Sequence, residues 1–221
     1  MKFWITLIFL TFSFLSFGQE FKIEYGNKRY MKYDYHCSHD NGFTLKKKLK
    51  DGKYLVNSKE NPEIILIEGN YQNRRKSGKW RIYNPYKKTT EYQTFENGQL
   101  ITEKGIDSLR RTFMEIKHTE NMDIGVYYGY HSKEQLRFKD EFWHTKKSKI
   151  NISTSTYFYP SGKLKSVTRY KNGNGHGKSF EYYENGLSKM EFEWDNDKQI
   201  GIWKWWNEKG EITKTKDYTT E

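Results

Sequence analysis

One short segment near the N-terminus gathers side chains that commonly bind metals or act as nucleophiles. It reads His36-Cys37-Ser38-His39-Asp40, and Cys37 is the only cysteine among the 221 residues. Imidazole and thiolate groups at this spacing are typical zinc ligands, but a structural zinc site needs four ligands. The other four histidines are scattered singly along the chain. The segment therefore favours a polar loop, and we expect no metal, no cofactor and no Cys–His nucleophile.

Two further patterns resemble enzyme motifs and are better explained by strands and turns. Glu181, Glu191 and Glu193, with Asp195 nearby, could suggest paired catalytic carboxyls, which need a cleft that holds two of them a fixed distance apart. On alternating strands they instead predict cross-strand pairs with Lys178 and Lys189. The glycine-rich segment 172–177 lacks the lysine and hydroxyl ending of a phosphate-binding loop. It predicts a turn, and the sequence as a whole predicts a protein that is not an enzyme.

The elements that carry these residues repeat along the chain with a period of 24 residues. Four sets of positions share this spacing: Gly162, Gly186 and Gly210; Phe158, Tyr182 and Trp206; Tyr170, Trp194 and Tyr218; and Gly177 and Gly201. Within one period, an alternating strand leads to a turn of the Asn185-Gly186 kind and then to a return strand. Asn and Gly tolerate the positive φ of tight hairpin turns. Each period therefore predicts one β-hairpin.

Weaker copies of the hairpin extend towards the N-terminus. Gly78, Trp80 and Tyr83 belong to a copy that lies 75 residues before its counterpart, and a more divergent copy begins near Gly125. We expect the array to span residues 51–218, with an irregular insertion near 101–122. The spacing of apolar residues predicts one short helix near 106–116 within that insertion.

The predicted fold class is therefore all-β, an elongated single-layer antiparallel meander of repeated hairpins. Aromatic residues make up 18% of the chain and there are only three prolines, a balance typical of strands with large amphipathic rings. Residues 19–50 are expected to form an N-terminal cap, because repeat arrays need their open ends covered.

The first 18 residues have the order of a secretory signal. Lys2 precedes an apolar run from Phe3 to Phe17, and Ser16 and Gly18 stand where a signal peptidase prefers small residues. We expect export to the periplasm, the outer envelope or the medium after cleavage near Gly18. The formal charge of +11 favours an acidic partner, an anionic glycan or an anionic membrane surface. Export makes nucleic acid an unexpected target.

The repeats resemble the variant MORN repeat, in which a glycine precedes an aromatic-rich strand and a turn glycine precedes an aliphatic residue. The residues that carry the resemblance are Gly177, Tyr182, Tyr183, Gly186 and Trp194, their counterparts at Gly201, Trp203, Trp206, Gly210, Ile212 and Tyr218, and the upstream Gly78, Trp80, Tyr83 and Phe95. The resemblance implies hairpins laid side by side in one twisted sheet. Exported bacterial chains of this kind carry the label of antitoxin component of a toxin–antitoxin system, so the resemblance also implies that role.

Alternation along the strands predicts which aromatic rings face outward. If the face of Phe158, Tyr182 and Trp206 is packed, then Trp203 and Trp205 face outward together with Tyr183 and Tyr159. Exposed Trp and Tyr favour contacts with proteins and sugars. The first hypothesis is a protein–protein interaction module, of which an antitoxin-like role would be one instance. The second is an envelope module that binds glycan or anionic lipid through these rings and nearby lysines.

Overall fold

The computed structural model describes residues 21–24, 51–58 and 61–219. The predicted signal at 1–18, the His36-Cys37-His39 segment and all but four residues of the predicted cap at 19–50 lie outside these ranges. Within them no helix occurs, and so no helix has the length and apolarity needed to cross a membrane.

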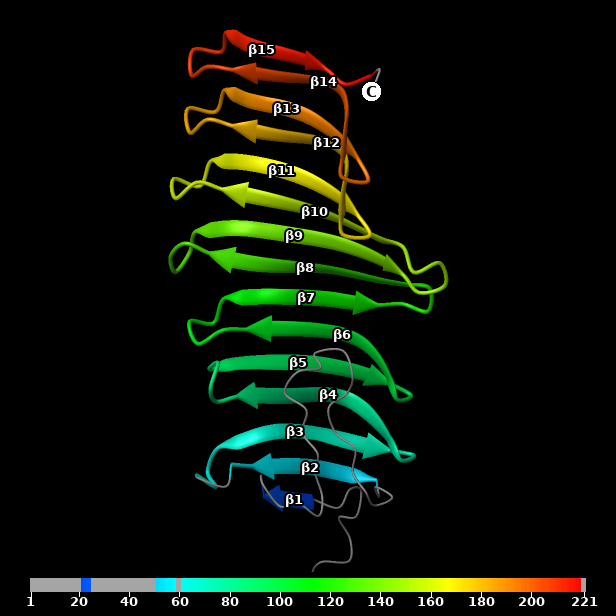
Figure 1. The fold of residues 1–221 in the computed structure, drawn as a ribbon. Coiled ribbons are helices and arrows are strands. Elements are labelled where there is room, and N and C mark those ends of the chain that lie inside the picture. The colour runs from blue at the N-terminus through cyan, green and yellow to red at the C-terminus, as the bar shows by residue number, and fades with distance from the viewer. Residues whose placement is uncertain (1–20, 25–50, 59–60, 220–221) are drawn as a thin grey trace, which may run out of the picture. The chain divides into compact units, whose positions relative to one another are not determined.

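The described chain folds into β-strands that follow one another in a single open sheet, in the order β1 to β15 (Figure 1). β1 runs parallel to β2, and β2 to β15 form an antiparallel meander. This confirms the predicted all-β hairpin meander. The strands are β1 (Phe21–Glu24), β2 (Gly52–Asn57), β3 (Ile65–Gln72), β4 (Arg75–Asn84), β5 (Thr89–Glu96), β6 (Gln99–Ile106), β7 (Thr112–His118), β8 (Met122–Tyr130), β9 (Leu136–Thr145), β10 (Asn151–Phe158), β11 (Leu164–Lys171), β12 (Asn174–Tyr182), β13 (Ser188–Asp195), β14 (Lys198–Trp206) and β15 (Ile212–Asp217).

The predicted helix near 106–116 is wrong, because these residues end β6, turn, and begin β7. Asp107 N donates to Arg111 O, and Arg110 N donates to Asp107 O. The same pair of bonds closes the turns that contain Gly186 and Gly210. Arg110 takes the left-handed conformation of these glycines, with φ of 62°. The segment is therefore an ordinary hairpin of the array in which an arginine stands at the turn-glycine position.

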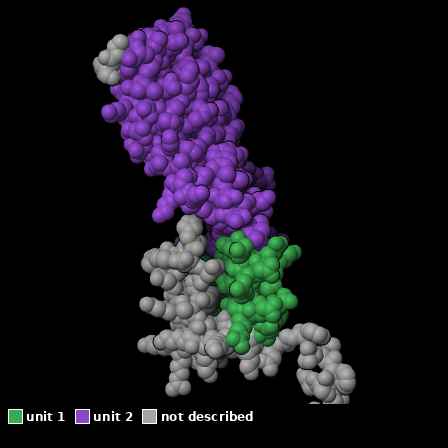
Figure 2. Space-filling view, turned by 90° about the vertical axis from the view of Figure 1, so that its right-hand side faces the viewer, with its two compact units in different colours: residues 1–85, 92–100 green, residues 86–91, 101–221 purple. Residues whose placement is uncertain are grey.

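The chain divides into two units, residues 1–85 with 92–100, and residues 86–91 with 101–221 (Figure 2). The first unit has a core of edge-to-face rings. Tyr71 contacts Tyr54 and Trp80 at centroid distances of 4.7 and 5.3 Å, and Trp80 contacts Phe95 at 6.2 Å. The ring of Trp80 lies directly over Gly69, where a Cβ atom would come within 2.0 Å of it. A glycine at 69 is thus required for this ring to lie flat on the sheet.

The second unit has an aromatic cluster on β13 and β14, completed by Tyr218 just after β15. Trp203 lies at its centre, with ring centroids at 4.9 Å from Trp194, 5.2 Å from Tyr218 and 5.4 Å from Phe192. The indole Nε1 of Trp203 lies within hydrogen-bonding distance of the carbonyl oxygens of Glu193 and Ile200, at 3.2 and 3.1 Å. The buried indole therefore also satisfies its only polar group.

Candidate binding surface

The expectation that Trp203 faces outward is wrong. Its side chain is only 4% exposed, and Trp205 is half-buried against the same cluster. Alternation correctly places the two tryptophans on one face, since Trp203 pairs with Lys216 and Trp205 with Lys214. Alternation alone does not say which face is packed, and here it is this one. Trp203 is therefore a core residue and offers no stacking surface.

Tyr159 and Tyr183, the other two predicted binding residues, join each hairpin to the next. Tyr159 Oη donates to Tyr182 O at 2.8 Å, and Tyr183 Oη donates to Trp206 O at 2.7 Å. His131, which occupies the same position in the divergent copy, places Nε2 3.0 Å from Phe158 O. The three accepting carbonyls belong to one repeating position, so these bonds are a periodic feature of the array. The hydroxyl groups of Tyr159 and Tyr183 therefore donate their hydrogen bonds within the chain.

The predicted cross-strand ion pairs are present in the same unit. Lys189 Nζ lies 3.1 Å from Glu181 Oε2, and Lys178 Nζ lies 3.7 Å from Glu191 Oε1. The segment 172–177 contains the turn between β11 and β12, with positive φ at Asn172 and Gly173. Both patterns that resembled enzyme motifs thus have structural roles.

An exposed apolar row crosses three neighbouring strands of the second unit. Ile124 of β8 lies directly opposite Trp143 of β9, and Trp143 lies opposite Ile152 of β10. Ile150, just before β10, extends the row at the adjacent turn. All four side chains are between 36% and 39% exposed. Contiguous exposed apolar groups on a sheet commonly mark an interaction site. We call these four residues the Trp143 patch.

Lysines surround the Trp143 patch. Lys117 lies opposite Ile124 on β7, and Lys171 lies opposite Ile152 on β11, so each end of the row carries a cation. Lys147 and Lys149 are exposed in the turn that leads to Ile150. An apolar centre with a charged rim is the usual composition of a binding interface. The rim charge here is positive, which favours a negatively charged partner.

A polar cluster lies on the opposite face of the sheet from the Trp143 patch, on β6, β7 and β8 and the turn after β9. His118 Nε2 is 2.9 Å from Glu103 Oε1, and His118 Nδ1 is 2.8 Å from Asp123 Oδ1. Lys146 Nζ is 3.1 Å from the same Asp123 oxygen and donates to Thr119 O. His118 stands at a repeat position that usually holds an aromatic residue. One period later, the equivalent position holds Phe142. The polar cluster therefore interrupts the aromatic core of the repeat.

Burial and three carboxyl groups, those of Glu103, Asp123 and the neighbouring Glu91, determine the pKa shifts in this cluster. Burial raises the pKa of Glu91, and the negative charge of Glu103 raises it further. Burial acts to raise the pKa of Asp123, but the hydrogen bonds from His118 and Lys146 act in the opposite direction and hold this pKa below its ordinary value. Burial and the charges of Glu103 and Glu91 raise the pKa of Tyr127. The pairs serve to keep buried charges compensated. Within the residues that the structure describes, no group of His, Cys, Asp and Glu side chains is arranged to hold a metal ion.

The Trp143 patch was not predicted, although the sequence contains a signal for it. Phe142 keeps the repeat spacing with Tyr170 and lies on the packed side, stacked on Tyr127 at 5.6 Å. Because neighbouring residues of a strand point to opposite faces, Trp143 must face away from that side. Ile124 and Ile152 follow from the strand register, which the sequence alone does not specify.

The comparisons with known proteins add no relative to this description. No protein-family model matches the chain, and no curated protein sequence matches it.

Proposed function

We propose that the chain is an exported, non-catalytic binding module that recognises an acidic protein partner through the Trp143 patch. The observation that supports this proposal is the apolar row Ile124–Trp143–Ile152, which has a lysine directly opposite each end. Tryptophan is enriched among the few residues that carry most of the binding energy of an interface, and the rim charges steer an oppositely charged partner. An antitoxin-like role, with an acidic exported toxin as the partner, would be one instance.

The test is affinity purification of the full mature chain from its native envelope, compared with matched variants. Trp143→Ser combined with Ile152→Ser removes the centre of the patch. Ile202→Ser is the control, because Ile202 is 49% exposed on β14, outside the patch. We expect one acidic protein to bind the native chain and the Ile202→Ser variant equally. The patch variant should bind it about 30-fold more weakly, as for the loss of an interface hot spot.

The proposal also predicts how the complex responds to charge. Lys117→Glu with Lys171→Glu should slow association and reduce its dependence on salt, because these residues lie at the rim. Lys163→Glu with Lys165→Glu changes the net charge equally, at a turn and strand away from the patch. Equal effects of the two pairs, or binding that is indifferent to Trp143, would refute the assignment of the patch.

A second candidate is an envelope module that binds anionic lipid through the same patch. Tryptophan, isoleucine and lysine side chains together are also the composition of membrane-surface contacts. Co-sedimentation with vesicles of phosphatidylglycerol and with vesicles of phosphatidylcholine separates the two. Binding to the anionic vesicles that is lost on Trp143→Ser, with no protein retained in the purification, would favour the lipid over the protein partner.

A further inference from the structure

The carboxylate of Asp140, on β9, lies among aromatic rings on the face of the second unit opposite the Trp143 patch. Tyr127 of β8 and Ser155 of β10 lie directly opposite Asp140 on the two neighbouring strands. Phe138 and Phe142 are its neighbours on the same face of its own strand, because side chains alternate along a strand. None of these four neighbours carries a positive charge, and Asp140 is the one carboxylate among them.

The rings around Asp140 are held in place by contacts with one another and with the sheet. Tyr127 stacks on Phe142 at a centroid distance of 5.6 Å, and Phe138 contacts Tyr157 of β10 at 5.9 Å. Phe138 and Phe142 each lie over a glycine of β8, where an added Cβ atom would come within 2.2 and 2.4 Å of the two rings. The site is open to solvent, because Tyr157 is 41% exposed and Asp140 is only half-buried.

The carboxylate of Asp140 has no hydrogen-bond or ion-pair partner within the residues that the structure describes. Its Oδ1 atom is buried and accepts no hydrogen bond. The guanidinium of Arg137 lies 5.3 Å from the ring centroid of Phe138 but forms no ion pair with Asp140. Burying a charge without a partner costs free energy, so an unpaired carboxylate in a ring-lined site needs an explanation.

The repeat does not require an acidic residue at this position. Phe142 corresponds to Tyr170, so Asp140 corresponds to Thr168 and, 24 residues further along, to Phe192. A hydroxyl or a ring is therefore compatible with the hairpin at this position. The carboxylate is thus a departure from the repeat that the fold itself does not explain.

We propose that Asp140 and the rings around it bind a quaternary ammonium group. The methyl groups of such a cation donate no strong hydrogen bonds, and aromatic faces together with one negative charge are what recognises it. A primary ammonium group would need three hydrogen-bond acceptors, and a hard metal ion would need several oxygen ligands. The inference does not rest on the Trp143 patch, because the two sites share no residue and face opposite sides of the sheet.

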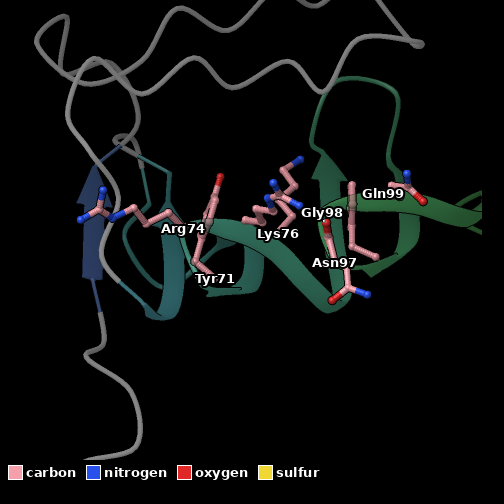
Figure 3. A pocket seen from close by; sticks show the side chains of 8 residues that line it. Tyr71, Arg74, Lys76, Asn97, Gly98 and Gln99 are labelled. Atoms are coloured by element: carbon pink, nitrogen blue, oxygen red, sulfur yellow. Dashed lines mark hydrogen bonds between the residues drawn. The ribbon is translucent and has the colours of Figure 1, made fainter.

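The test is an NMR titration of the full mature chain with choline chloride, at constant ionic strength maintained with sodium chloride. We expect saturable shifts at the amides of Asp140 and Ser155. The amide of Gly98 should not shift, because Gly98 lines a hollow of about 380 Å³ in the first unit together with Arg74 and Arg75, which repel a cation (Figure 3). The uncharged analogue of choline, in which a tert-butyl group replaces the trimethylammonium group, should bind about tenfold more weakly.

Matched variants test the role of the carboxylate. Asp140→Asn keeps the shape of the side chain and should weaken choline binding by about tenfold or more. Asp195→Asn makes the same change of charge on β13, where the Asp195 side chain is 53% exposed, and should change binding less than about twofold. Asp140→Thr introduces the residue that the repeat has at 168, so it should fold and no longer bind choline.

Three results would overturn the inference: equal binding of the uncharged analogue, equal losses in Asp140→Asn and Asp195→Asn, or choline binding that survives in folded Asp140→Thr. Vesicles of phosphatidylcholine then identify the source of the group. Co-sedimentation that is lost in Asp140→Asn and retained in Trp143→Ser assigns it to a lipid headgroup. Choline binding without retention on the vesicles assigns it to a free solute.

Discussion

His118 and Glu103 form a hydrogen-bonded pair inside the sheet, with 2.9 Å between Nε2 and Oε1 and a Glu103 side chain that is only 3% exposed. The repeat places an aromatic ring where His118 stands. His118→Phe should therefore fit the site sterically and still reduce the free energy of unfolding, by about 2 kcal/mol, because it removes a hydrogen-bond partner from a buried carboxylate. Urea denaturation at pH 6 measures this loss.

The matching double variant separates polarity from shape. Glu103→Leu with His118→Phe removes both hydrogen-bonding groups and should recover most of the lost stability, since replacing both partners of a buried polar pair by apolar groups can be nearly neutral. A double variant that is less stable than His118→Phe alone would show that the pair is net stabilising.

Glu91→Gln should stabilise the protein at neutral pH. The folded protein binds the Glu91 proton more tightly than the unfolded chain does, because burial and the charge of Glu103 raise the pKa of Glu91. Ionising Glu91 therefore costs stability, which decreases as the pH rises from the ordinary glutamate value through the raised one. We expect a gain of about 1 kcal/mol, or about 2–4 °C in Tm, at pH 7. At pH 3 the variant and the native chain should melt alike, and a gain of the same size there would contradict this explanation.

Arg110→Gly should stabilise the turn between β6 and β7. Arg110 adopts a φ of 62°, a region that costs a residue with a Cβ about 1 kcal/mol relative to glycine. The reciprocal change Gly186→Ala, at a φ of 93°, should destabilise by about the same amount. Thermal unfolding of both variants checks the pair, and opposite signs are the expected result.

Tyr183→Phe should weaken the attachment of the last hairpin. It removes the hydrogen bond from Oη to Trp206 O, which is worth about 1 kcal/mol. Hydrogen exchange of the β14 and β15 amides should accelerate more than that of the β8 and β9 amides. If Tyr183 instead contacted a partner and not the chain, the variant would lose binding with unchanged exchange.

The repeat determined how far the fold could be predicted. The 24-residue spacing of Gly162, Gly186 and Gly210 places three turns correctly, and all three glycines have positive φ. The turn at Arg110 escaped prediction because its conformation is dictated by the bonds that close the hairpin and not by its side chain. Helical spacing of neighbouring apolar residues then became the stronger local signal.

The candidate site was harder to predict than the fold. Alternation pairs Trp203 with Trp205, but burial depends on which face the Phe192 and Tyr218 rings cover, a property of several strands at once. The Trp143 patch depends on a register that aligns Ile124, Trp143 and Ile152 across three strands.

The bonds from Tyr159 to Tyr182 and from Tyr183 to Trp206 join equivalent atoms one period apart. The chain is thus modular in length. Excision of residues 177–200 would bring Trp206 O to the place of Tyr182 O, so that Tyr159 regains an acceptor without any new side chain. Duplication of the same segment would lengthen the array by the same rule. Growth and loss of whole hairpins are therefore changes that this architecture accommodates. Extra residues in a connecting turn are accommodated too, because His131 reaches Phe158 O across a separation of 27 residues, whereas Tyr159 reaches Tyr182 O across 23.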